Sequence, residues 1–126
     1  MKKIISTEKA PTAIGPYSQA VEAGNTLYVS GQLPIDLKSG TIVEGSITEQ
    51  TEQVLENIGA ILDEAGYTYE DVVKSTVLLE NMDDFKAMND VYGKFYSKNP
   101  PARAAYQVVK LPLGVMIEIE TIAVKG

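Results

Sequence analysis

The chain contains a single arginine, and its surroundings suit the binding of a small anion. Arg103 is the only arginine, the other basic residues being lysines. It follows Pro100 and Pro101, so a stiff turn leads into a segment of small residues that includes Ala104 and Ala105. A guanidinium group can bind a carboxylate through two parallel hydrogen bonds. Arg103 is therefore a candidate carboxylate-binding residue, and a solvated arginine at the end of a strand is the competing interpretation.

Two glutamates near the C-terminus are the next candidates. Glu118 and Glu120 alternate with apolar residues, so in a strand they share one face, about 6.6 Å apart. Met116, Ile122 and Val124 lie on the same face, which is therefore not a plainly polar surface. A carboxylate in partly apolar surroundings can accept a proton from water. A solvent-facing strand is the commoner explanation, and a glycosidase pair is disfavoured because no tryptophan is present as a sugar platform.

Other polar residues could complete a site. Gly31, next to Ser30 in a predicted strand, would let a ligand approach the backbone closely. Tyr17 could stack on a flat ligand or donate its hydroxyl. Asn89 lies in a predicted helix at the edge of its apolar stripe. For each of these residues taken singly, turn formation, core packing or, for Asn89, simple exposure is the commoner explanation.

The composition excludes several kinds of chemistry. Cysteine and histidine are both absent, which rules out thiol nucleophiles, Ser-His-Asp relays, imidazole bases and zinc sites built from those residues. No cluster of acidic residues indicates a metal, and no phosphate-binding loop indicates a nucleotide cofactor. The net charge of −6 disfavours nucleic-acid binding.

The length of 126 residues fits one domain, residues 1–126. No apolar run approaches the roughly 18 residues that a membrane span requires. The first residues do not resemble a signal peptide, so we expect a cytoplasmic protein.

A helix is predicted most clearly over residues 46–65. Ser46 and Glu49 form a capping-box pattern at its start, and Gly66 is well placed to end it. Apolar and small residues at steps of three and four form one stripe, made of Ile47, Thr51, Val54, Leu55, Ile58 and Leu62.

A second helix is predicted to begin at Asn81 and to be closed by residues 99–101, which contain two prolines. Its expected apolar face comprises Met82, Phe85, Met88, Tyr92 and Phe95.

Strands are predicted around these helices. Residues 17–22 and 27–33 form a hairpin, residues 71–79 a third strand, and residues 103–110 and 115–124 a final pair. This order predicts an α+β fold, with antiparallel pairs at both ends of one mixed sheet and two helices on one face. The other face should be polar or buried by another subunit.

Several segments resemble the RidA/YjgF family of reactive-intermediate deaminases, also labelled endoribonuclease L-PSP. The resemblance covers nearly the whole chain, and the matching segments are residues 13–20, 29–34, 88–92, 101–103 and 111–120. It implies a chorismate-mutase-like fold. It also implies a homotrimer whose sheets pack into a central β-barrel, with the sites in clefts between subunits. Such an assembly would cover the bare face of the sheet.

The same resemblance implies roles for individual residues. Arg103 would bind the substrate's carboxylate, and Glu118 would position the attacking water. Residues lining the cleft would be Tyr17, Ser30, Gly31 and Asn89. Some family members carry cysteine where this chain has Ala105. Only a backbone contact from Ala105 remains possible here, so thiol-dependent behaviour is excluded.

The implied activity is hydrolysis of 2-iminobutanoate or 2-iminopropanoate, the imines formed when PLP enzymes dehydrate threonine or serine, to 2-keto acids and ammonia. No cofactor is expected. One alternative is a non-catalytic trimer that binds small acids, as a metabolite sensor or a chaperone. An endoribonuclease is a weaker alternative, because the chain is acidic and lacks histidine.

Overall fold

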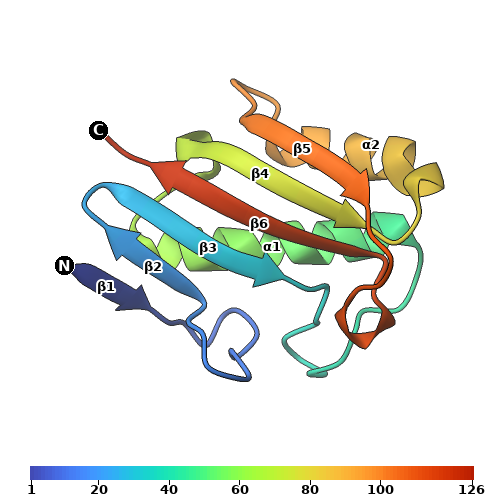
Figure 1. The fold of residues 1–126 in the computed structure, drawn as a ribbon, viewed down its shortest axis with the longest axis horizontal. Coiled ribbons are helices and arrows are strands. Elements are labelled where there is room, and N and C mark those ends of the chain that lie inside the picture. Colours follow the sequence, from blue (N-terminus) through green and yellow to red (C-terminus); the bar gives the residue numbers. More distant parts are fainter.

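Six strands form one mixed sheet, and two helices cover one of its faces (Figure 1). The computed structural model describes all of residues 1–126. The strand order is β1-β2-β3-β6-β4-β5. Neither helix has the length and continuous apolar character of a membrane span. The elements are β1 (Lys2–Ile5), β2 (Ala20–Ala23), β3 (Thr26–Gln32), α1 (Ile47–Ala65), β4 (Val72–Leu79), α2 (Phe85–Phe95), β5 (Ala102–Gln107) and β6 (Ile117–Val124).

Helix α1 is bounded as its sequence predicts. The Ser46 side chain accepts a hydrogen bond from the Thr48 N–H at 3.3 Å, and the Ser46 N–H donates to Glu49 Oε1 at 2.7 Å. The helix ends at Gly66, whose φ of 81° lies in the left-handed region that favours glycine. The predicted stripe is buried against the sheet, which confirms the periodicity.

The second helix differs from its prediction at both ends. Asn81 caps a short 3-10 turn, Met82–Asp84, that leads into α2. Met82 is 39% exposed and lies outside the buried face, whereas Val91 is buried and was not expected there. The 3-10 turn winds more tightly than an α-helix, so Met82 is rotated away from the stripe. The helix ends at Phe95, before the predicted proline stop.

The expected antiparallel pairing of the last two strands is wrong. β5 pairs in parallel with β4, with Arg103 opposite Ser75. β6 lies between β3 and β4 and is antiparallel to both. Its side chains Ile117, Ile119 and Ala123 are fully buried beneath the helices. A central position buries these residues better than an edge position would. β1, which the pattern did not predict, forms the opposite edge by pairing with β2.

The face away from the helices carries large exposed side chains. Tyr28 is 51% exposed and Tyr106 50%, and Val124 and Ile122 lie on the same face. This face agrees with the bare sheet surface that the element order predicted.

Buried amides on α1 hold the loops that follow β3 and precede β6. The Asn57 side chain donates to the carbonyl oxygens of Leu33 and Ile35, both at 3.1 Å. Gln50 Oε1 accepts from the Met116 N–H at 2.8 Å. The candidate residues Gly31 and Glu118 lie next to these anchored segments.

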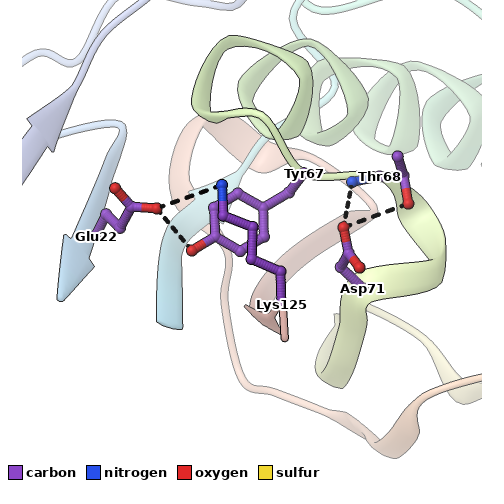
Figure 2. A network of polar contacts seen from close by, with 5 residues as sticks. All are labelled: Glu22, Tyr67, Thr68, Asp71 and Lys125. Atoms are coloured by element: carbon purple, nitrogen blue, oxygen red, sulfur yellow. Dashed lines mark hydrogen bonds and ion pairs between the residues drawn. The ribbon is translucent and has the colours of Figure 1, made fainter. Parts of the chain in front are cut away.

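A polar network joins β2, the end of α1 and the C-terminal segment (Figure 2). The Tyr67 hydroxyl donates to Glu22 Oε2 at 2.7 Å, and Lys125 Nζ lies 3.9 Å from the same oxygen. Lys125 Nζ also lies 4.3 Å from the centre of the Tyr67 ring. Burial, together with the adjacent Glu22, raises the pKa of Tyr67 to about 12.

We expect this network to make stability depend on pH in the alkaline range. Because the folded-state pKa of Tyr67 exceeds its unfolded value, its contribution is complete below pH ~10 and is lost as the pH rises through ~12. Tyr67→Phe should lower the free energy of unfolding at pH 7 by about 1–2 kcal/mol, because Glu22 loses a donor. It should also flatten the fall in stability between pH 10 and 12. Urea titrations at several pH values measure both effects, and equal pH slopes for variant and wild type would contradict the assignment.

Candidate active site

A β-bulge in β3 brings Gly31 against Glu118. Val29 pairs with Thr121 and Gln32 with Ile119, so two residues of β3 lie opposite one residue of β6. A Cβ atom built on Gly31 would overlap the Glu118 carboxylate. Glycine is therefore required here by the close approach of the side chain from the neighbouring strand.

Glu118 is half-buried and projects from the open face of the sheet. Burial, and to a lesser extent the charge of Glu120, raises the pKa of Glu118. No lysine or arginine forms an ion pair with Glu118. A carboxylate of this kind can accept a proton from a water molecule.

The segment before β2 is fixed beside this bulge by Gln19 and Ser30. The Ser30 N–H donates to the Gln19 carbonyl at 3.0 Å, and Ser30 Oγ donates to the Ser18 carbonyl at 2.6 Å. The buried Gln19 side chain bonds to the backbone of Thr7, Ala10 and Pro11. Tyr17, 52% exposed, and Gly31 line one shallow pocket. We call Tyr17, Ser30, Gly31 and Glu118 the glutamate half-site.

Arg103 is held by neutral groups. Its Nη1 donates to Asn89 Oδ1 at 2.7 Å. Its Cζ lies 4.8 Å from the centre of the Tyr92 ring and 5.5 Å from that of Phe85. No acidic side chain forms an ion pair with it. We call Arg103, Asn89, Tyr92 and Phe85 the arginine half-site. Its remaining N–H donors are available to an anion.

Ala105 belongs to the same free edge of β5. The Val108 N–H donates to the Leu79 carbonyl on β4 at 2.9 Å. Because the direction of backbone groups alternates along a strand, the N–H and C=O of Ala105 point away from β4, toward the open edge. The Ala105 backbone is thus unpaired near Arg103, and its contact with a ligand stays a prediction.

The two half-sites do not meet within one chain. Arg103 lies opposite Ser75, which is fully buried on the helix side of β4. Glu118 lies opposite Leu78, three residues further along β4 and therefore on the other face. The structure thus brings together Tyr17, Ser30, Gly31 and Glu118 in one group, and Asn89 and Arg103 in another.

Sequence reasoning missed three residues that support these groups. Phe85 and Tyr92 were assigned to the apolar face of α2, although their rings lie beside Arg103. The only signal in the sequence was Arg103 itself, because aromatic rings can pack against a guanidinium group. Gln19 lies in the segment 13–20 that carries the resemblance, but its structural role was not foreseen. Its side chain accepts from the Thr7 N–H and donates to the backbone carbonyls of Thr7, Ala10 and Pro11. No group of three or more carboxylates forms a possible metal site.

Comparison with known proteins identifies relatives that match this chain over nearly its whole length. The model of the family described as Endoribonuclease L-PSP matches residues 7–125. A RutC family protein of Pyrococcus horikoshii is 57% identical over 99% of both chains. The 2-iminobutanoate/2-iminopropanoate deaminase of Capra hircus is 55% identical over 100% of this chain and 92% of its own.

Among solved structures, Escherichia coli TdcF with bound serine is 40% identical and superposes with a TM-score of 0.94, covering 98% of this chain and 99% of TdcF. The fold and the matching motifs thus agree with the resemblance found in the sequence. The chain belongs to the Endoribonuclease L-PSP family, also known as the RidA/YjgF family.

Proposed function

We propose that this protein is a deaminase that hydrolyses 2-iminobutanoate and 2-iminopropanoate to 2-keto acids and ammonia. The observation that carries the proposal is Arg103, the only arginine, held by Asn89 without any acidic partner. Such a group suits a small carboxylate ligand. The deaminase name of the Capra hircus relative and the serine bound to TdcF support a substrate of amino-acid size.

We further propose that the active site forms between copies of the chain in a homotrimer, each protomer contributing one domain. The arginine half-site lies at the edge strand β5, and the glutamate half-site lies on the open face of the sheet. Packing of the open faces into a central β-barrel would bury Tyr28 and Tyr106 and let Arg103 of one protomer approach Glu118 of the next. The arginine half-site would then supply the cation that binds the substrate, and the glutamate half-site would supply the base.

In this mechanism Arg103 and the Ala105 N–H bind the substrate's carboxylate. A charge-assisted contact of this kind contributes about 1.5–3 kcal/mol. Tyr17 and Gly31 line the cleft beside the imine carbon. Holding the imine and a water molecule in reacting geometry lowers the entropic part of the barrier.

Glu118 then accepts a proton from water as the water oxygen bonds to the imine carbon. The C=N π electrons move to the nitrogen, which takes up that proton from Glu118 to give a tetrahedral intermediate with one hydroxyl and one amino group. The hydroxyl proton then passes through Glu118 to the nitrogen as the C–N bond breaks, so ammonia leaves, the C=O bond forms and a 2-keto acid remains. The raised pKa of Glu118 makes it a stronger base than an exposed carboxylate. Water is the only co-reactant.

Arg103→Ala should lower kcat/KM by roughly 10- to 100-fold, as expected for the loss of one charge-assisted contact. Arg103→Lys should recover little, because an ammonium group lacks the planar fork. The assay couples a threonine dehydratase to this protein and follows 2-ketobutyrate. Lys38→Ala, which removes an exposed charge elsewhere, is the matched control. Full activity in Arg103→Ala would remove the proposal.

Glu118→Gln should lower kcat by about 100-fold or more while changing the affinity for 2-ketobutyrate little, because only proton transfer is lost. Glu120→Gln, on the same strand face, is the control and should retain most activity at pH 8. The serine bound to TdcF also favours a second candidate, a non-catalytic protein that binds small acids. Binding of 2-ketobutyrate by a wild-type protein that does not accelerate imine hydrolysis would support that candidate instead.

Mixing the two variants of low activity tests whether the site is shared between chains. The variants Arg103→Ala and Glu118→Gln are unfolded together in equal amounts and refolded. Arg103 is intact in one half of the protomers and Glu118 in the other half, so one quarter of the sites between protomers should contain both. The mixture should therefore recover about one quarter of wild-type activity. Each variant refolded alone should keep only its own residual activity, which for Arg103→Ala is about one tenth of the wild-type value or less. A mixture no more active than its components would show that both residues must come from one chain.

A further inference from the structure

We propose that Tyr92 is a positioning residue, whose ring holds the Arg103 guanidinium in its ligand-binding orientation before the ligand arrives. This inference deepens the proposed function and rests on the carboxylate-binding role of Arg103. The proposed role of Tyr92 acts through Arg103, by holding its guanidinium group in place.

The first support is that groups from α2 surround the end of the Arg103 side chain. Arg103 belongs to β5, yet Asn89, Tyr92 and Phe85 all belong to α2. The Tyr92 ring is the nearer of the two, with its centre 4.8 Å from Arg103 Cζ, within the range of a cation–π contact. Asn89 accepts one hydrogen bond, whereas the ring occupies none of the guanidinium's donors. Tyr92 can therefore restrain the group without competing with an anion.

The second support is that the Tyr92 ring is itself fixed by a row of aromatic side chains. Tyr92 is only 5% exposed, and its ring centre lies 4.6 Å from that of Tyr96. Tyr96 meets Tyr69 edge-on at 5.7 Å. The Tyr69 hydroxyl donates to the Leu55 carbonyl of α1 at 2.7 Å. This row links Arg103 to α1, the longest helix of the chain, so the guanidinium rests on a rigid support.

A restrained guanidinium has a functional consequence. Arginine loses much rotamer freedom when it is immobilised by a ligand, and a side chain ordered in advance avoids most of that loss. Removing the Tyr92 ring should therefore weaken carboxylate binding even though every N–H donor of Arg103 remains.

Tyr96 provides a matched control for a purely structural role of Tyr92. Both residues are 5% exposed, and both hydroxyls are buried beside the Ser75 hydroxyl. Tyr96 follows Tyr92 by one helical turn and makes no cation–π contact with Arg103. Truncating either ring should cost similar packing energy, but the truncation of Tyr92 should release Arg103 much more than the truncation of Tyr96, because only Tyr92 contacts the guanidinium.

The presence of a single arginine makes the test direct, because its Nε–H gives one unambiguous signal in ¹⁵N NMR spectra. In the unliganded wild type, the order parameter of this N–H should approach the rigid-backbone value of about 0.85. A value below about 0.6 in the wild type would overturn the proposal without any variant being made.

In Tyr92→Leu the order parameter should fall, and the Kd for 2-ketobutyrate should rise about fivefold, the effect of losing one cation–π contact. Tyr92→Phe should retain both wild-type values, whereas Tyr96→Leu, which removes a support of the Tyr92 ring but leaves the cation–π contact, should change both values by less than Tyr92→Leu does. Equal effects of Tyr92→Leu and Tyr96→Leu on both readouts would overturn the positioning role. These readouts do not require catalysis, so a lack of deaminase activity would count against the proposed function alone.

Discussion

β6 lies between β3 and β4, and the remaining arrangement of the molecule depends on this insertion. Its alternate side chains Ile117, Ile119 and Ala123 enter the core, which leaves Glu118 on the opposite face. The same insertion leaves β5 with only β4 as a partner, so Arg103 lies at a free edge of the sheet. One choice of strand neighbours thus positions both residues to which we assign chemistry.

Glu118 and Arg103 lie in different electrostatic surroundings. Glu118 is partly removed from water and lies near another carboxylate, which favours its protonated form and makes it a better base. Arg103 stays exposed and is held by an amide oxygen and two aromatic rings. An acidic partner for Arg103 would have neutralised the charge that a carboxylate ligand needs. Leaving both charges without an ion-pair partner in the single chain is consistent with a ligand that lies between them in an assembly.

Several predictions from the sequence depend on short-range interactions and were confirmed. The period of α1, its capping box and Gly66 act within a few residues, so the chain alone reveals them. The sheet with two helices on one face also followed from the order of elements. The pairing of β5 with β6 was wrong, and β1 was missed, because strand neighbours are chosen by competition among distant segments for burial. Nothing local to residues 103–110 indicates that β4 is a better partner than β6.

The same distinction applies to the site. The sequence pointed to Arg103 because it is the only arginine and a guanidinium group suits a carboxylate ligand. It pointed to Glu118 because an acid among apolar neighbours can accept a proton. Only the tertiary structure showed that they lie on opposite faces, that Gly31 is required beside Glu118, and that Tyr92 lies beside Arg103. The sequence by itself determined which groups are available. Their orientation depended on helix packing and on strand register. In a strand, each step of one residue moves a side chain to the opposite face of the sheet.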